Sequence, residues 1–134
     1  MEVTPLTWHL IVTAKDERAA QRVLHRVCAT VGDTVGDRVI GRSRKVPGQF
    51  SIVFTTALEA TTPAGAVFQA LTDAQRLGAG WMVAGPNTHG DGRWSFEMIC
   101  AVNANGRFLV PGLTWAHVEI TPAGQPDVTA ASGP

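Results

Sequence analysis

Leu113-Thr114-Trp115-Ala116-His117-Val118-Glu119-Ile120 alternates strictly between two kinds of side chain. A period of two is typical of a β-strand, whose successive side chains point to opposite faces of a sheet. One face of this strand is mainly apolar and suited to burial. The other carries Trp115, His117 and Glu119, which combine an aromatic ring with two ionisable groups. If this second face is open, it could bind a ligand, a metal or a second subunit.

Length and composition predict a single folded domain. The chain has 134 residues, of which 45% are hydrophobic and 16% are charged, enough apolar material for one core. We expect this domain to span residues 1–120. Residues 121–134 are rich in Pro, Ala, Gly, Ser and Thr, so they are predicted to form a flexible tail. Lys plus Arg and Asp plus Glu each number 11, and this balance argues against a dedicated nucleic-acid-binding protein.

The cysteines and the N-terminal residues point to a cytoplasmic location. Cys28 and Cys100 fall in apolar patterns, which favours small buried side chains over a disulfide and indicates a reducing compartment. Burial would raise the pKa of both thiols and make them poor nucleophiles. The first residues lack the basic flank and apolar run of a signal peptide, and no apolar run reaches membrane-spanning length. High Ala, Gly, Val and Arg with few Lys would suit a GC-rich bacterial genome.

Turn-forming residues divide the rest of the chain into elements. In chain order we expect a strand at 8–13, a helix from the 13–16 cap to Gly32, strands 39–46 and 49–56 joined by Pro47-Gly48, a helix from Thr62-Pro63 to Gly78, a long loop at 85–92, and strands at 93–102 and 113–120. The first helix has an apolar stripe of Ala20, Leu24, Val27, Cys28 and Val31. The second has Val67, Leu71 and Ala74, with Phe68 beside them.

This order predicts an α+β fold of the ferredoxin-like type, a two-layer sandwich with both helices on one face of an antiparallel sheet and one added C-terminal strand. It resembles ferredoxin-like modules and dimeric α/β barrels in element order alone, and such a resemblance implies a fold and not a function. The uncovered face would show His9, Ile11, Thr13, Trp115, His117 and Glu119, with Ser95, Glu97 and Ile99 from the strand before.

Metal and cofactor sites are not expected. His9, His117 and Glu119 could form a set of two histidines and one carboxylate, but their spacing does not require it. The signatures Cys-x-x-Cys and His-Glu-x-x-His are absent, and the glycine pairs at 78–80 and 90–92 lack the strand-to-helix setting of a phosphate loop. His89 is interpreted as an exposed turn residue.

The preferred functional hypothesis is a small non-enzymatic protein-binding module of the immunity, regulatory or adaptor type. Trp115 and Trp94 would act as aromatic anchors, and Arg42 and Arg44 would form a basic sheet edge. We expect the partner to be another protein or a second copy in a homodimer, with a small-molecule ligand as a further option and no nucleic acid or membrane.

The alternative is a small dimeric acid–base enzyme of the α/β-barrel-like kind, such as an isomerase, a cyclase or an oxygenase-like module. In that case His117 would be the base, Glu119 would orient it, and His9 would be a second acid. Nothing in the sequence names a substrate.

Overall fold

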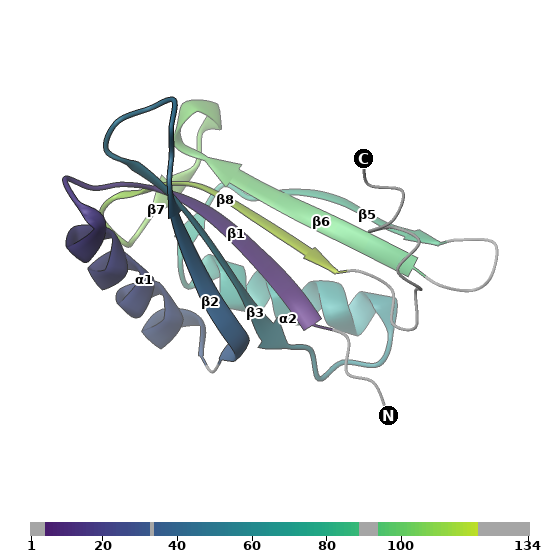
Figure 1. Cartoon of the computed structure of the whole chain (residues 1–134). Coiled ribbons are helices and arrows are strands. Elements are labelled where there is room, and N and C mark those ends of the chain that lie inside the picture. Colours follow the sequence, from purple (N-terminus) through teal and green to yellow (C-terminus); the bar gives the residue numbers. More distant parts are fainter. Residues whose placement is uncertain (1–4, 33, 89–93, 121–134) are drawn as a thin grey trace.

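The computed structural model describes residues 5–32, 34–88 and 94–120. Within these residues it has an α+β architecture with one six-stranded antiparallel sheet and two α-helices (Figure 1). The strands of this sheet are β1 (Pro5–Thr13), β2 (Thr34–Arg42), β3 (Gln49–Ala57), β5 (Met82–Thr88), β6 (Trp94–Ala101) and β8 (Leu113–Ile120), and the helices are α1 (Glu17–Val31) and α2 (Pro63–Gln75). A separate two-stranded ladder joins β4 (Gly78–Ala79) to β7 (Arg107–Phe108), and the 3-10 helix η1 covers Val102–Ala104.

The sheet is larger than a simple ferredoxin-like layout. Its strand order is β2-β3-β1-β8-β6-β5, so β6 and β5 extend it beyond β8. The expected α+β class is confirmed, but the last strand is not an addition at the edge, because β8 lies between β1 and β6. The long loop predicted at 85–92 is wrong in its first part, where β5 continues to Thr88. Turn-forming Gly85-Pro86 is accommodated there by a register shift between Ala84 and Asn87 in an edge strand.

Both helices pack on the same face of the sheet; in Figure 1, α2 is seen behind the strands and α1 to their left. The alternation in β1 is complete, because Leu6, Trp8, Leu10 and Val12 are fully buried in the core between sheet and helices. The stripe predicted for α1 is confirmed, with Ala20, Leu24, Val27, Cys28 and Val31 all buried. The face of the sheet away from the helices is hereafter called the open face.

Of the stripe predicted for α2, Ala74 is buried, whereas Val67 and Leu71 are only partly buried. The side chains that reach the core are Ala66, Ala70 and Ala74, spaced four apart, whereas Phe68 is 73% exposed. Small side chains let the helix axis approach the sheet closely, and the larger Val67 and Leu71 pack at the side of this contact, partly buried. The expectation that Phe68 lies beside the buried stripe is therefore wrong.

The predicted start of α2 is confirmed, but α1 starts later than the capping box predicted at residues 13–16 would have it, because Thr13 still belongs to β1 and is not the N-cap. Asp16 is the N-cap of α1, and its Oδ1 accepts a hydrogen bond from the Ala19 backbone N–H at 2.8 Å. Thr62 Oγ1 caps α2 in the same way, accepting from the Gly65 N–H at 3.1 Å, with Pro63 at the first helical position. Each cap satisfies a backbone donor that the first turn of a helix leaves free.

The hairpin between β2 and β3 turns at Pro47-Gly48, as predicted. The Gln49 N–H donates to the Val46 carbonyl at 3.2 Å, and Gly48 has a φ of 78°. A proline followed by a residue of positive φ is the signature of a type II turn. Strand β2 ends at Arg42, earlier than expected, because Ser43 Oγ accepts hydrogen bonds from the backbone N–H groups of Lys45 and Val46 and folds residues 43–48 into a loop.

A buried hydrogen bond fixes β1 against β3. Trp8 Nε1–H donates to Thr56 Oγ1 at 2.9 Å, and Thr56 is the one buried polar or charged residue of the described chain. The Trp8 indole also stacks on Phe54, with ring centroids 5.8 Å apart. A buried indole N–H needs a hydrogen-bond partner, so the pair of Trp8 and Thr56 favours this register of β1 on β3 over registers shifted by one residue.

Trp8→Phe should lower the free energy of unfolding by about 2–4 kcal/mol, because it leaves Thr56 Oγ1 without its donor and removes buried ring atoms. Urea unfolding followed by circular dichroism measures this loss. Adding Thr56→Val should recover part of it, since removing both polar partners costs less than orphaning one. Strictly additive losses in the double variant would contradict the role of the hydrogen bond.

Both thiols lie in the core, as the sequence predicts. Burial raises the pKa of Cys28, an effect that Arg38 partly opposes. Burial also raises the pKa of Cys100, against a smaller opposing effect of a backbone hydrogen bond from Arg107. Cys100 Sγ–H donates to the Ala79 carbonyl at 3.3 Å.

We therefore expect slow labelling of Cys28 and Cys100 by a disulfide reagent in the folded protein at pH 8, and rapid labelling in urea. Burial raises the pKa of both thiols, so folding favours their protonated form. The stability gained from keeping the thiols protonated is fully present below the ordinary thiol pKa and is lost as pH rises above it. Labelling rates measured against pH in the Cys100→Ala variant isolate Cys28. Equal rates for folded and unfolded protein would contradict its burial.

Candidate functional site

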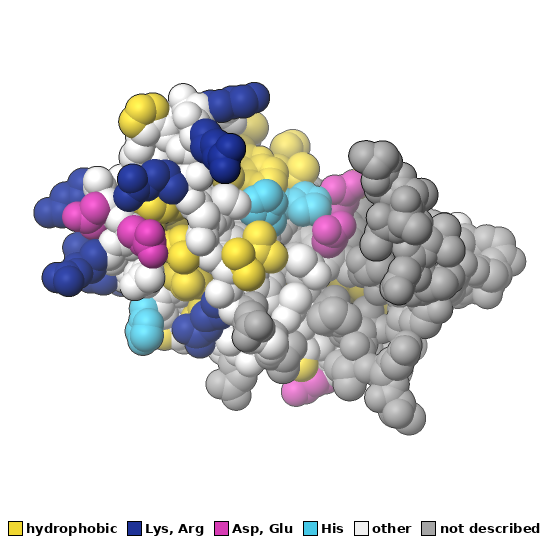
Figure 2. Space-filling model, viewed as in Figure 1, with side chains coloured by type: hydrophobic (Ala, Val, Ile, Leu, Met, Phe, Trp, Pro, Cys, Tyr) yellow, Lys and Arg dark blue, Asp and Glu magenta, His cyan; other side chains and the backbone are white. Residues whose placement is uncertain are grey.

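A row of side chains crosses all six strands on the open face. Each member is the direct cross-strand partner of the next, so all six project from the same side of the sheet. This central row, from β2 to β5, consists of Val39, Val53, His9, His117, Ile99 and Met82. Its two ends are well exposed, at 59% for Val39 and 55% for Met82. Figure 2 shows this face, with hydrophobic side chains gathered beside two histidines.

Trp115 joins the two histidines into an aromatic cluster. Its indole stacks on the His117 ring, with centroids 5.9 Å apart and planes within 10°. The His9 ring meets the same indole edge-on at 5.3 Å and 84°. Residues from β1 and β8 that are far apart in sequence thus form one compact group. The sequence placed all three on this face, and the structure brings them into contact.

Each histidine is held through one ring nitrogen. His9 Nε2 is 2.9 Å from Ser51 Oγ on β3, and His117 Nε2 is 2.7 Å from Glu97 Oε1 on β6. The His117 side chain is 18% exposed, whereas that of Glu97 is 52% exposed. The Nε2 atom of each imidazole is thus hydrogen-bonded to a side chain of a neighbouring strand, and this contact sets the orientation of both rings.

The carboxylate that contacts His117 comes from Glu97, whereas the sequence interpretation assigned this orienting role to Glu119. Residues His117 and Glu119 are two apart on one strand, a separation of roughly 7 Å. Glu97 instead lies diagonally across from His117 on β6. The direct partner of His117 is Ile99, two residues further along the same strand. The sequence placed Glu97 on the open face but could not identify this contact, because it depends on the pairing register of β6 with β8.

Glu97 and Glu119 are direct cross-strand partners. Both side chains are exposed, and the pairing of β6 with β8 puts them on the open face, two residues beyond the pair formed by Ile99 and His117. Carboxylates directly opposite one another destabilise a strand pair. A cation approaching this part of the face would relieve that repulsion.

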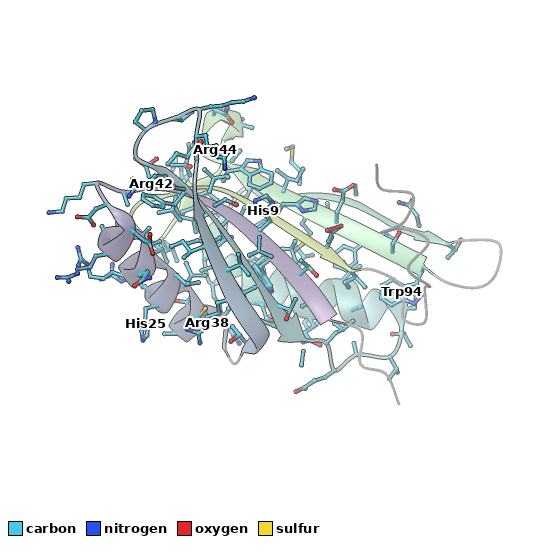
Figure 3. The ribbon with its side chains drawn as sticks, viewed as in Figure 1. His9, His25, Arg38, Arg42, Arg44 and Trp94 are labelled. Atoms are coloured by element: carbon cyan, nitrogen blue, oxygen red, sulfur yellow. The ribbon has the colours of Figure 1, made fainter. Side chains whose placement is uncertain are left out.

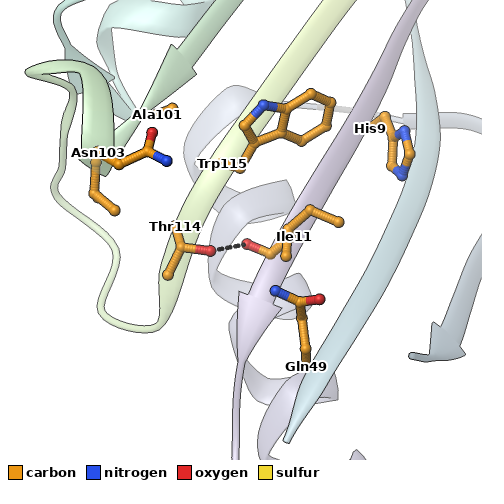
Figure 4. Close-up of a pocket in the computed structure, with 8 residues that line it drawn as sticks. His9, Ile11, Gln49, Ala101, Asn103, Thr114 and Trp115 are labelled. Carbon is orange, nitrogen blue, oxygen red and sulfur yellow. Dashed lines mark hydrogen bonds between the residues drawn. The ribbon is translucent and has the colours of Figure 1, made fainter. Parts of the chain in front are cut away.

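A depression of about 450 Å³ lies beside the aromatic cluster (Figure 4). Its lining comes from β1, β3 and β8 and from the β6–η1 junction, and consists of His9, Ile11, Gln49, Ala101, Val102, Asn103, Thr114 and Trp115. Thr114 Oγ1–H donates to the Ile11 carbonyl at 3.2 Å across the floor. A volume of this size is within the range of small-molecule sites, roughly 300–1,000 Å³.

Two of the residues proposed as anchors lie on the other side of the sheet. Trp94 has the same strand parity as buried Phe96 and packs against the core. The Arg42 guanidinium carbon lies 5.5 Å from the centroid of the Phe50 ring, on the helix side. Figure 3 places Trp94 far from His9, and shows Arg42 and Arg44 near the same end of the sheet. Of the four proposed anchors, Trp115 is the one whose side chain belongs to the open face, and Arg44 lies in the loop at its end.

The described residues hold no group of three or more His, Cys, Asp or Glu side chains arranged to bind a metal ion. His9 and His117 are direct cross-strand partners, but the Nε2 atom of each is already engaged. His89 and the tail at 121–134 lie outside the described residues.

Comparisons with known proteins found no relative of this chain: no family model, no curated protein and no solved structure matches it. Neither α1 nor α2, the two α-helices of the described chain, has the length and apolarity needed to cross a membrane.

Proposed function

We propose that the chain is a small, non-enzymatic protein-binding module that works in the cytoplasm and docks its partner on the open face. The central row is the observation that carries this proposal. Its side chains form an apolar and aromatic band across all six strands, and both α-helices of the described residues pack on the other face of the sheet. Covering such a band removes apolar surface from water, which is the main favourable term in protein association.

The surroundings of the band match the organisation of a protein interface. Trp115 lies near its middle, and tryptophan is enriched among residues that dominate binding energy. Polar and charged side chains lie around it, among them Thr7 and Glu119 on one side and Gln49 on the other. An apolar centre with a polar rim is typical of specific interfaces.

The two edges of the sheet are poorly suited to binding by strand addition. Edge strand β2 has exposed Arg38 and Arg42 and a register shift between Val35 and Val39, where Gly36 has a φ of 77°. Edge strand β5 contains Pro86, which has no N–H to donate, and its own register shift. Charges, prolines and bulges at edges hinder pairing with another chain. Docking on the face is thereby favoured over docking at an edge.

We also interpret β2, β3, β1 and β8 with the two helices as a ferredoxin-like unit. The chain order strand, helix, strand, strand, helix, strand supports this interpretation once β5 and β6 are treated as an inserted pair before β8. In such a unit the helices occupy one face and leave the other for binding.

A second candidate function is a small acid–base enzyme, favoured by the 2.7 Å contact between His117 and Glu97 close to the depression. A histidine oriented by a carboxylate is a common general base, and His9 lines the depression as a second proton carrier. This candidate predicts that His117→Ala abolishes turnover and leaves docking intact. The docking proposal predicts the larger effect from Trp115→Ala.

Photocrosslinking in the native host tests the docking proposal. A benzoylphenylalanine introduced at Val39 or Met82 on the open face should give one discrete covalent adduct. The same group at Phe68, exposed on α2 outside the open face, is the matched control and should give none. Adding Trp115→Ala should reduce the adduct at least about tenfold, because truncating a central tryptophan commonly costs 2 kcal/mol or more.

Thermal unfolding of the Trp115→Ala variant verifies that it is still folded at the temperature of the assay. The absence of an adduct from both open-face positions, or an equal yield from Phe68, would refute the docking function.

A further inference from the structure

We propose that the occupant of the open face is a second copy of this chain, packed face to face about a two-fold axis. This inference rests on the docking function proposed above and identifies its partner. It is carried by the distribution of charge on the open face, by the residues that lie between the charged groups, and by the size of the face.

Charged groups of opposite sign flank the open face at diagonally opposite positions. Exposed Arg44 and Lys45 lie in the loop that joins β2 to β3, beyond one end of those strands. Glu97 and Glu119 lie toward the other end, on β6 and β8. In Figure 2, Lys and Arg side chains border the hydrophobic centre on one side, and a pair of acidic side chains borders the histidines on another.

A symmetric pair requires a surface that is complementary to itself. When two copies meet about a two-fold axis, each residue pair is made twice, with the roles of the copies exchanged. An axis in the plane of the face, midway between the basic loop and the acidic pair, places each group over its opposite in the other copy. Both acidic pairs would then face cations, which relieves the repulsion between Glu97 and Glu119.

Residues on such an axis meet their own copies, so they must tolerate contact with themselves. With regular strand spacing, the line midway between the two charged groups crosses β1 between His9 and Ile11, and it crosses β8 near Trp115. Continued across β3, it passes near Val53. These side chains are aromatic or apolar, and charged groups are kept away from the line. The pattern is the one that an isologous interface needs.

The size of the open face places the pair among the small protein interfaces. Five strand spacings of about 4.8 Å and six residue steps of about 3.4 Å give on the order of 500 Å² per copy. A total near 1,000 Å² is at the lower limit for a specific interface, so we expect a dimer that dissociates in the micromolar range. The charge pairs then contribute noticeably, and high salt should weaken the dimer.

Complementary charge reversal tests this arrangement. One variant carries Glu97→Lys and Glu119→Lys, and a second carries Arg44→Glu and Lys45→Glu. Each alone places like charges opposite one another in both halves of the dimer, so self-association should weaken at least about tenfold. Mixed in equal amounts, the two variants should form a heterodimer, because every contact then joins opposite charges.

Sedimentation velocity over about 1–300 μM, in low salt, measures these states against the unaltered chain. The matched control carries Arg18→Glu and Arg22→Glu on the exposed side of α1, which changes net charge as much as the Arg44 and Lys45 substitutions do. It should dimerise like the unaltered chain.

Three results would overturn the inference: an unaltered chain that is monomeric throughout this range, charge-reversed variants that still dimerise alone, or a mixture that does not associate. The crosslinking experiment separates this failure from failure of the docking function. An adduct between the open face and a different protein, together with a monomeric chain, leaves docking intact and excludes the symmetric pair.

Discussion

The register of β1 between β3 and β8 is the constraint on which the rest of the structure depends. Successive side chains of β1 point to opposite faces, so a slip of one residue would move Trp8 to solvent and His9 into the core. The hydrogen bond from Trp8 Nε1 to Thr56 Oγ1 holds against that slip, because a displaced indole would leave a buried polar group without a partner. The composition of the open face follows directly from this choice.

Cross-strand pairing then builds the site from residues that are distant in the chain. The register of β6 with β8 brings Glu97 to His117, and the register of β1 with β3 brings Ser51 to His9. The same pairings align the central row across six strands. The open face thus combines an apolar band, an oriented pair of histidines and separated charges, and this combination suits association with a second protein surface better than any feature taken alone.

The other face of the sheet is covered and its two edges are protected, which leaves the open face as the free surface of the sheet. Helices α1 and α2 cover the opposite face, with α2 held close by its buried alanines. Both sheet edges have features that resist strand addition, as Pro86 in β5 illustrates. Phe68 is exposed because the alanines occupy the side of α2 that faces the sheet. A residue two positions from Ala66 and from Ala70 points away from that side of the helix.

The sequence by itself determined the features that depend on local spacing: the two faces of β1 and β8, the buried stripe of α1, the cap at Thr62, and the turn at Pro47-Gly48. Only the tertiary structure decided that β8 lies inside the sheet, that β5 replaces part of a predicted loop, and that Glu97 is the carboxylate partner of His117. Strand order and register are set by the packing of segments far apart in the chain, and periodicity within one segment has no information about which strand will lie beside it.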